Sequence, residues 1–491
     1  TKALCQEKFS EWQSKFKKIK VGLLTSDTVD YEENSFYDLN LVLCTPEKLD
    51  FLTRRWNNYK KSFMTIKLCL VDEIHTINQD RGAVLEAVIT RVKKLNSTIR
   101  FIAVSATVPN ICDIKEWLTT NSKTCDLLTF DQSYRPIQLK KVVEALPIDS
   151  KNSFQQEKIF ITKVPNLIKK YSQGNSTLIF CATRSSTQQT AKLIAQNASH
   201  KCTSNNIEYI EDDSLKLLCY KGVAYHHAGI SLNDRKIIEN LFRDNKIFVL
   251  CSTSTLAVGV NINCFLVIIK GTKHWSSEGE KEYSELDIQQ MIGRSGRPGT
   301  YENGVAVILT TTDKEKLYKT MLTCDCPIES TIHFQFLEHI CSEIEIGSID
   351  DVKTCKEWIS LTYYFTRYKK NPSYYNMENS LSISPEGDLA DISKSIFEIL
   401  LSSELVTFDK KSKKYMCTEY GKSMCRNYLS FKSINVLKVN MSDYSINALL
   451  ELVSKAITEN HNKSIKNTEK IFLRTINTSP RIRYPLLDKK N

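Results

Sequence analysis

The sequence lacks the long apolar runs of membrane proteins and the paired cysteines of metal ribbons. None of its hydrophobic stretches approaches the ~20 apolar residues that a membrane-spanning helix needs, and no secretory leader is visible. Its 16 cysteines include no C-x-x-C pair, which argues against zinc ribbons. Several of them lie in strand-like apolar runs, a pattern typical of reduced, buried thiols inside a cell. Repeats of solenoid length and low-complexity tracts are also absent.

A phosphate-binding loop of the G-x-x-x-x-G-K-[ST] type is missing as well. The one Gly-Lys-Ser, at residues 421–423, has Met416 where the first glycine of such a loop should stand, so we interpret it as a chance match. What the chain does have is length, 491 residues, which is enough for three or four domains. Its 67 lysines and arginines against 56 acids give a net charge of +11, which is compatible with a polyanionic partner without proving one.

Two adjacent acids, Asp72 and Glu73, follow an apolar run from Ile66 to Val71 that predicts a buried strand of a parallel sheet. Ligands of open α/β sheets bind beyond the carboxyl ends of the strands, where these acids fall. Burying two acids side by side is costly unless a cation compensates. The pair therefore predicts a magnesium–nucleotide site, with Asp72 holding the metal shell and Glu73 polarising the attacking water. Taken alone, an ordinary Asp-Glu pair in a loop explains the residues equally well.

A second group of residues, Gln290 to Arg297, favours the nucleotide site. Arg294 and Arg297 are three residues apart, which predicts one helical face, and the glycines between them allow close backbone approach. The guanidinium fork suits phosphate oxygens, and an arginine that reaches a γ-phosphate accelerates its transfer by roughly 10³–10⁵. Alone, the pattern could mark a basic helix end. The histidine pair His226-His227 has no further Cys or His nearby in the sequence and does not predict a metal site.

Strand-like and helix-like segments alternate, which predicts an α/β fold with doubly wound parallel sheets. A polar passage at 130–175 is interpreted as the connection between two such domains. Beyond Pro327, helices are followed by a basic hairpin, which suggests a winged-helix module, although the lysine run 410–414 is also typical of a solvated turn. The expected strands are 40–44, 66–71, 100–104, 177–181, 222–225, 246–251, 265–270 and 304–309, and the expected helices include 81–95, 332–341, 354–368 and 392–401.

In this order the motifs resemble those of superfamily-two helicases of the DExH type, in the processive branch that includes exosome, spliceosomal, archaeal repair and meiotic crossover helicases. The segments that carry the resemblance are 2–7 (motif Ia), 45–48 (Ib), 72–75 (II), 105–110 (III), 180–184 (IV), 225–229 (IVa), 253–261 (V) and 290–297 (VI). Within the branch, the resemblance is to the meiosis-specific ATP-dependent DNA helicase group, on Val267–Lys270, His274 and Glu282–Ile288. Val258, Asn263 and Ser26 depart from the usual pattern without touching the catalytic groups.

The resemblance implies two tandem RecA-like domains, at 1–135 and 136–325, then a winged-helix domain at 326–430 and the start of a helical ratchet domain at 431–491. The first domain is expected to lack its beginning, with the phosphate loop upstream of Thr1, so this piece alone should show negligible ATPase activity.

The resemblance also implies roles for single residues. The catalytic residues would be Asp72 (holding Mg²⁺ through water), Glu73, Arg294 and Arg297. The residues coupling nucleotide to nucleic acid would be His75, Ser105, Thr107 and Gln290. Gly259 and Asn261 would join the two arginines in binding nucleotide, and DNA would be contacted by Thr45, Pro46, Arg184 and Thr255.

The function implied is that of a nuclear ATP-dependent DNA helicase using ATP and Mg²⁺, moving 3′ to 5′ and unwinding duplexes in meiotic recombination. Its partners would be single-stranded DNA and duplex junctions and no membrane, together with recombination proteins that the sequence does not identify. Two alternatives stay open: an RNA helicase of the same branch, which shares every catalytic motif, and a catalytically inactive helicase-like scaffold.

Overall fold

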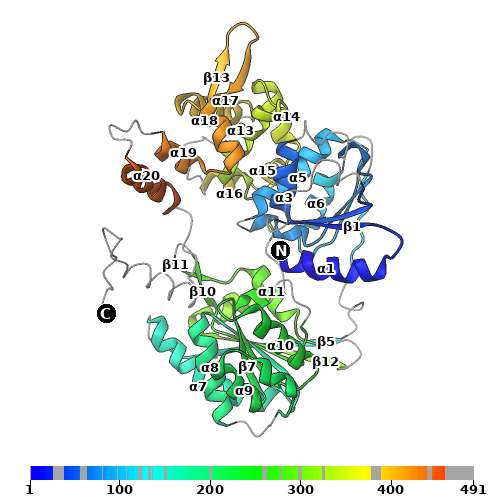
Figure 1. Ribbon diagram of the computed structural model, residues 1–491, viewed down its shortest axis with the longest axis vertical. Helices are drawn as coiled ribbons and strands as arrows, with labels where there is room; N and C mark the ends of the chain where they lie inside the picture. The colour runs from blue at the N-terminus through cyan, green and yellow to red at the C-terminus, as the bar shows by residue number, and fades with distance from the viewer. Residues whose placement is uncertain are drawn as a thin grey trace. The chain divides into compact units, whose positions relative to one another are not determined.

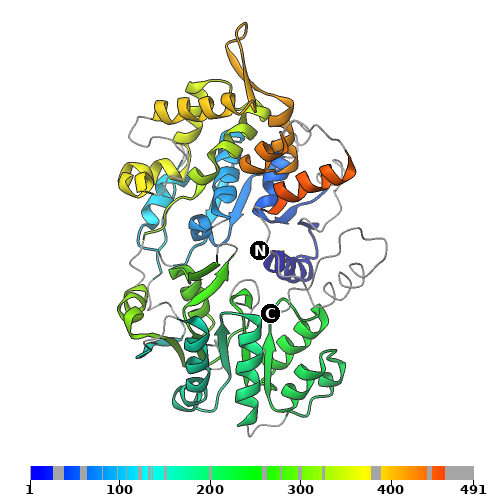
Figure 2. The same ribbon diagram turned by 90° about the vertical axis from the view of Figure 1, so that its left-hand side faces the viewer.

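The helices and strands form two compact units (Figures 1 and 2). Unit 1 comprises residues 1–132 with 323–459, and unit 2 comprises 133–322 with 460–491. No helix in the described part of the chain is long and apolar enough to cross a bilayer. The computed structural model describes residues 2–25, 38–55, 63–79, 81–96, 98–106, 108–119, 124–130, 134, 137–148, 152–197, 202–256, 262–276, 279–296, 301–322, 327–377, 389–438 and 445–458.

The first segment of unit 1 is α/β, with two pairs of parallel strands. Strands β1 (Val21–Leu24) and β2 (Leu41–Cys44) form one pair, and β3 (Leu68–Val71) and β4 (Arg100–Ala103) form the other. The helices of this segment are α1 (Lys2–Lys15), α3 (Pro46–Arg54), α5 (Gly82–Leu95) and α6 (Ile111–Leu118). Helix α5 lies where its apolar spacing predicts it, with Ala83, Ala87 and Val88 buried.

The prediction that β3 is a buried strand is wrong on one face. Leu68 and Leu70 are 46% and 52% exposed, while Val71 is buried. Because strand residues alternate between two faces, Leu68 and Leu70 point the same way, and that face of the strand is only about half covered.

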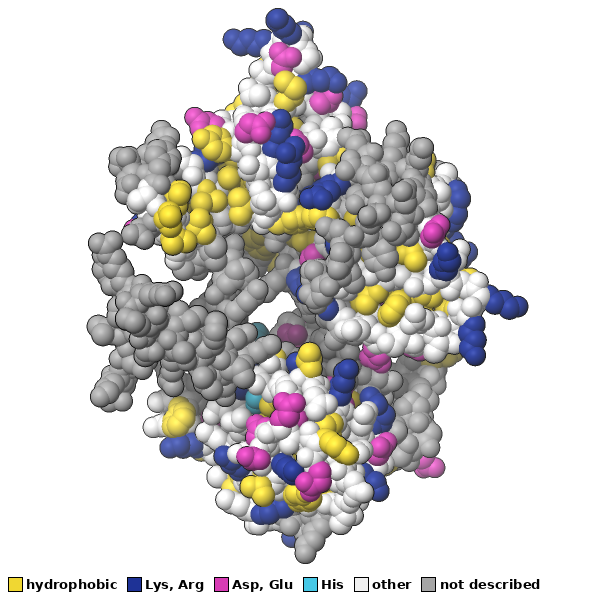
Figure 3. All heavy atoms as spheres, in the orientation of Figure 1, with side chains coloured by type: hydrophobic (Ala, Val, Ile, Leu, Met, Phe, Trp, Pro, Cys, Tyr) yellow, Lys and Arg dark blue, Asp and Glu magenta, His cyan; other side chains and the backbone are white. Residues whose placement is uncertain are grey.

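The second segment of unit 1 is helical with one antiparallel hairpin. Its elements are α13 (Phe336–Ile346), α14 (Val352–Ser360), α15 (Tyr363–Lys370), α16 (Pro372–Met377), α17 (Leu389–Ser402), β13 (Val406–Asp409), β14 (Lys414–Cys417), α18 (Glu419–Asn427), α19 (Phe431–Leu437) and α20 (Ile446–Thr458). The single helix expected at 354–368 is in fact two, because Thr362 caps a new helix by accepting a hydrogen bond from the Phe365 amide. Hairpin β13–β14 projects from the helices around it, with the exposed lysines of residues 410–414 at its tip (Figure 3).

A buried ionic network joins the two segments of unit 1. Arg91 on α5 donates to Asp50 of α3 at 2.7 Å and to Glu343 of α13 at 2.6 Å, and all three side chains are at most 1% exposed. Burial by itself raises the pKa of Asp50, but the guanidinium groups of Arg91 and Arg54 outweigh this effect and hold the pKa below its usual range. Because water is excluded, each buried charge is stabilised by its ionic partners. The Arg91–Glu343 pair joins residues more than 250 positions apart and so holds the two segments together.

Unit 2 is built on a six-stranded parallel sheet in the order β5-β12-β9-β6-β8-β7. Its strands are β5 (Gln138–Leu146), β6 (Thr177–Cys181), β7 (Val223–His226), β8 (Val249–Ser252), β9 (Leu266–Lys270) and β12 (Asn303–Thr311). Its remaining elements are α7 (Ser153–Tyr171), α8 (Arg184–Gln196), α9 (Asp213–Tyr220), α10 (Leu232–Arg243), hairpin β10 (Lys273–Ser276)–β11 (Gly279–Glu282), α11 (Glu285–Ile292) and α12 (Glu315–Met321). The core is formed by the strands, with every residue of β6, β7, β8 and β9 buried.

The interpretation of residues 130–175 as a mere connection is wrong. They contain β5, at one end of the strand order, and the 19-residue helix α7, both in unit 2. The segment is polar in sequence because α7 exposes much of its surface, including Gln155, Lys158 and Lys163, and Pro165 inside the helix resembles a helix break.

Candidate functional site

Asp72 and Glu73 lie where expected, directly after the carboxyl end of β3. They are not buried side by side as the sequence suggested: Asp72 is exposed and the Glu73 side chain is 46% exposed. Glu73 adopts φ 54° and ψ 45°, the left-handed region, which turns the chain sharply out of the strand. The turn is fixed by the Ile74 amide, which donates to Val104 O on the neighbouring strand at 3.0 Å.

The donor set at Asp72 fits a magnesium ion. Its carboxylate supplies hard oxygen ligands and is open to solvent, which suits an ion that retains most of its waters. Oδ1 accepts the Glu73 amide proton at 3.0 Å, which fixes the orientation of the carboxylate. A bound Mg²⁺ would supply charge stabilisation for phosphate oxygens, and Asp72 is the residue that would hold it.

His75 connects the acids of motif II to Ser105-Ala106 of motif III. The ring is fully buried, and Nδ1 accepts the Ala106 amide hydrogen at 2.9 Å, with Ser105 Oγ at 3.4 Å. Because Nδ1 is the acceptor, the ring proton of neutral His75 resides on Nε2. Nε2 lies 3.0 Å from Glu73 Oε2, close enough for electrostatic attraction but not aligned as a hydrogen bond. The structure thus brings Glu73, His75 and Ser105 together.

Thr45 and Pro46 begin helix α3. The Thr45 hydroxyl accepts the Lys48 amide hydrogen at 3.4 Å as an N-cap, and Pro46 occupies the first turn. Thr45 is 4% exposed, so its side chain stabilises the helix start.

In unit 2, Arg184 of motif IV meets residues 227–229 of motif IVa at the carboxyl edge of the sheet. A Cβ placed on Gly229 would lie 3.2 Å from Arg184 Nη1 and 3.1 Å from His227 Nδ1, so glycine makes room for both side chains. The Gly229 amide donates to His227 Nδ1 at 3.1 Å. Burial, together with the charge of Arg184, lowers the pKa of His227 to about 4, which keeps the ring neutral beside the guanidinium.

Motif VI differs from its predicted form. Helix α11 ends at Ile292, so Arg294 follows the helix and does not lie on it as its spacing predicted. Gly293 caps the end of the helix, and Gly296 further along has φ +93°, where a Cβ would meet Ile137 at 2.8 Å. Arg294 O accepts the Cys264 amide hydrogen at 3.0 Å, just before β9, which puts Arg294 at the amino edge of the sheet, opposite Arg184.

Gln290 precedes this turn on α11, and its Oε1 is buried with no hydrogen-bond partner among the described residues. Thr107, Gly259, Asn261 and Arg297 lie outside the described residues, as does the side chain of Thr255.

Sequence reasoning missed the support beneath Arg184. Lys270, at the end of β9, is fully buried and donates to Ser186 and Thr190 of α8 at 2.8 Å each, and it also contacts Glu157 of α7. These contacts fix the start of α8, where Arg184 sits, against two other elements. A lone lysine closing the apolar run 265–269 was the available signal, because a buried charge needs partners.

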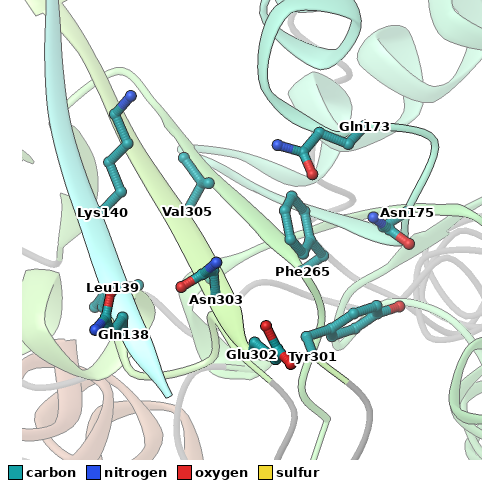
Figure 4. Close-up of a pocket in the computed structure, with 11 residues that line it drawn as sticks. Gln138, Leu139, Lys140, Gln173, Asn175, Phe265, Tyr301, Glu302, Asn303 and Val305 are labelled. Carbon is teal, nitrogen blue, oxygen red and sulfur yellow. The ribbon is translucent and has the colours of Figure 1, made fainter.

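A pocket of about 610 Å³ opens at the amino ends of β5, β12 and β9 (Figure 4). Gln138, Asn303 and Phe265 come from these neighbouring strands or the residues just before them, and Tyr301 packs edge-on against Phe265 at 5.4 Å. None of the predicted site residues lines it.

Two helicase family models match the chain. Residues 1–114 match the DEAD/DEAH box helicase family, and residues 160–299 match the helicase conserved C-terminal domain. The chain is 38% identical over 499 residues to "ATP-dependent DNA helicase MER3" of Saccharomyces cerevisiae, covering 100% of this chain and 41% of that protein. It is 35% identical over 519 residues to "Probable ATP-dependent DNA helicase HFM1" of Xenopus tropicalis, covering 99% of this chain and 38% of the relative.

Among solved structures, the DUF1998 helicase MrfA bound to DNA superposes with a TM-score of 0.59 at 17% identity, over 88% of this chain and 52% of that chain, which is a likeness of fold. The chain spans about two fifths of the length of these two curated relatives. Two helicase domains in order, and the 35–38% identity to the MER3 and HFM1 relatives along the whole chain, identify it as a DExH-box helicase of the meiotic crossover group.

Proposed function

We propose that this chain is the motor part of an ATP-dependent DNA helicase of meiotic recombination, acting in the nucleus and moving 3′ to 5′ on single-stranded DNA. The observation that carries the proposal is the contact of His75 with Glu73, with the Ser105 hydroxyl and with the Ala106 amide. Through it, a change in the position of Glu73 during hydrolysis moves motif III, as a nucleotide-driven motor requires. Glu73 would act as the general base, and Arg294 and Arg297 would stabilise the transferred phosphoryl group. Asp72 would hold Mg²⁺ with its water shell.

Strand displacement tests the proposal directly. The full-length protein should separate a DNA duplex with a 3′ single-stranded tail in the presence of ATP and Mg²⁺, and should fail on the same duplex with a 5′ tail. A matched RNA duplex is the second arm, since an RNA helicase of the same branch would prefer it. Equal failure on every substrate, with no DNA-stimulated ATP hydrolysis, would favour an inactive scaffold.

Replacing Arg184 by alanine should weaken binding of single-stranded DNA uniformly across sequences. Arg184 places one cation at the carboxyl edge of the unit 2 sheet, so its loss should remove one phosphate contact. The salt dependence of binding, log K against log [salt], should become shallower by about 0.7. Fluorescence anisotropy at several salt concentrations measures this slope, with Arg243→Ala as the control because Arg243 is an exposed cation on α10. An unchanged slope would contradict the DNA contact.

Replacing His75 by alanine should uncouple ATP hydrolysis from strand separation. The change leaves the Ala106 amide without its buried acceptor, which should also reduce the free energy of unfolding by ~1–3 kcal/mol. ATP hydrolysis with and without single-stranded DNA, measured beside strand displacement, should show fewer base pairs opened per ATP. His75→Gln offers a side-chain oxygen as acceptor and should restore part of the coupling, whereas normal coupling in His75→Ala would refute the role.

A further inference from the structure

Three cysteines that are far apart in the sequence meet in the core of unit 1. Cys341 lies in α13, Cys417 ends β14 and Cys425 lies in α18, and their Sγ atoms are all within 4.8 Å of one another. Cys341 Sγ and Cys417 Sγ are 3.6 Å apart. The three side chains are between 0% and 9% exposed. No other trio of His, Cys, Asp or Glu in the described part of the chain comes together in this way.

The spacing of the sulfur atoms suits a metal ion at their centre. A zinc–sulfur bond of about 2.3 Å places tetrahedral ligands roughly 3.8 Å apart and trigonal ligands roughly 4 Å apart. The Cys341–Cys417 separation of 3.6 Å is close to these values, and the other two pairs of sulfur atoms lie within 4.8 Å. Gly421 permits the approach of α18, because a Cβ there would lie 2.1 Å from Leu405 O and 3.4 Å from Cys341 Sγ. The glycine of the Gly-Lys-Ser at 421–423 is therefore explained by close packing and not by phosphate binding.

A cation lies beside the cluster: Arg54 Nη1 lies 3.4 Å from Cys425 O. The cysteines would bind a metal ion as thiolates. A cationic neighbour offsets the net negative charge that three thiolates and one divalent ion would leave in a buried site.

We propose that Cys341, Cys417 and Cys425 bind one thiophilic metal ion, either Zn²⁺ with water as the fourth ligand or Cu⁺ in a three-coordinate site. Thiolates select these two ions over Mg²⁺ and Mn²⁺. The ion ties hairpin β13–β14 to α13 and α18, and its role is structural. The site is independent of the nucleotide site, which uses oxygen ligands on the first segment.

Metal analysis of the whole 491-residue chain tests the proposal. The protein is produced with Zn²⁺ or Cu⁺ supplied, dialysed under reducing conditions in metal-free buffer, and measured by inductively coupled plasma mass spectrometry. We expect about one zinc or copper ion per chain, and the ratio in the two preparations tells which ion the site prefers. The double variant C417S/C425S should lose about tenfold or more of the bound metal, with circular dichroism confirming that each variant folds.

Cys355→Ser is the matched control, because Cys355 is fully buried in the same core and belongs to no such cluster. It should retain the metal of the unchanged protein. Cobalt substitution adds a second readout, a thiolate-to-cobalt charge-transfer band that disappears in C417S/C425S alone. A metal-free protein after supplementation, equal metal in C417S/C425S, or a Cys341–Cys417 disulfide found by mass spectrometry in place of bound metal would each overturn the proposal.

Discussion

Replacing Glu73 by glutamine in the full-length protein should lower the rate of ATP hydrolysis by about 10²–10⁴-fold, while ATP still binds. Glutamine keeps the shape of the side chain and can still face His75 Nε2, which lies 3.0 Å from Glu73 Oε2, but it cannot take a proton from the attacking water. Steady-state hydrolysis measures the loss, and titration with a fluorescent ATP analogue measures the retained binding.

Glu116→Gln is the control for this prediction, since Glu116 is an exposed carboxylate on α6 that pairs with Lys370. Its rate of hydrolysis should equal that of the unchanged protein. If Glu73→Gln hydrolyses ATP at the normal rate, Glu73 is not the general base.

Replacing Arg91 by methionine should reduce the free energy of unfolding of unit 1 by ~3–5 kcal/mol. Methionine fills much of the volume but leaves the buried carboxylates of Asp50 and Glu343 without their shared cation. Urea unfolding followed by tryptophan fluorescence reports on this unit, because Trp117 and Trp358 are both buried in it.

Lys94→Met, one turn away on α5, provides the comparison, because Lys94 is exposed and donates only to Ser348 O. Its unfolding midpoint should shift little. Because Arg91→Met is destabilised by buried carboxylates that have lost their cation, the double variant with Glu343→Gln should recover part of the free energy of unfolding. A stability loss no larger than that of Lys94→Met would mean that the network does not hold the segments together.

The strands of unit 2 were the most predictable part of the fold. Residues 177–181 are apolar without interruption because both faces of β6 are covered, and the predicted and observed bounds agree. An apolar run did not reveal α7, because much of this helix is exposed and its sequence is therefore largely polar. The burial of Leu68 and Leu70 was also predicted wrongly, since an apolar run indicates a strand but does not show which neighbouring elements cover its faces.

The position of Asp72, Glu73 and His75 was predictable, because they follow an apolar run that forms strand β3; their roles stay predictions. The position of Arg294 was not predictable, because α11 ends at Ile292 with Gly293 as its cap, before the helix that the spacing suggested would reach Arg294. The cysteine cluster had no sequence signal at all, because Cys341 and Cys417 are 76 residues apart and meet only through packing.

Unit 1 is made from two stretches of chain, and the strands of unit 2 lie entirely between them. During synthesis, all six strands of unit 2 are made before Glu343, the partner of Arg91. Glu86 is in the same position, because its hydrogen-bond donors, the Ser330 hydroxyl and the Tyr364 amide, are also made after unit 2. Since a buried charge without partners is strongly unfavourable, the first segment of unit 1 completes its fold only after its second segment has been made.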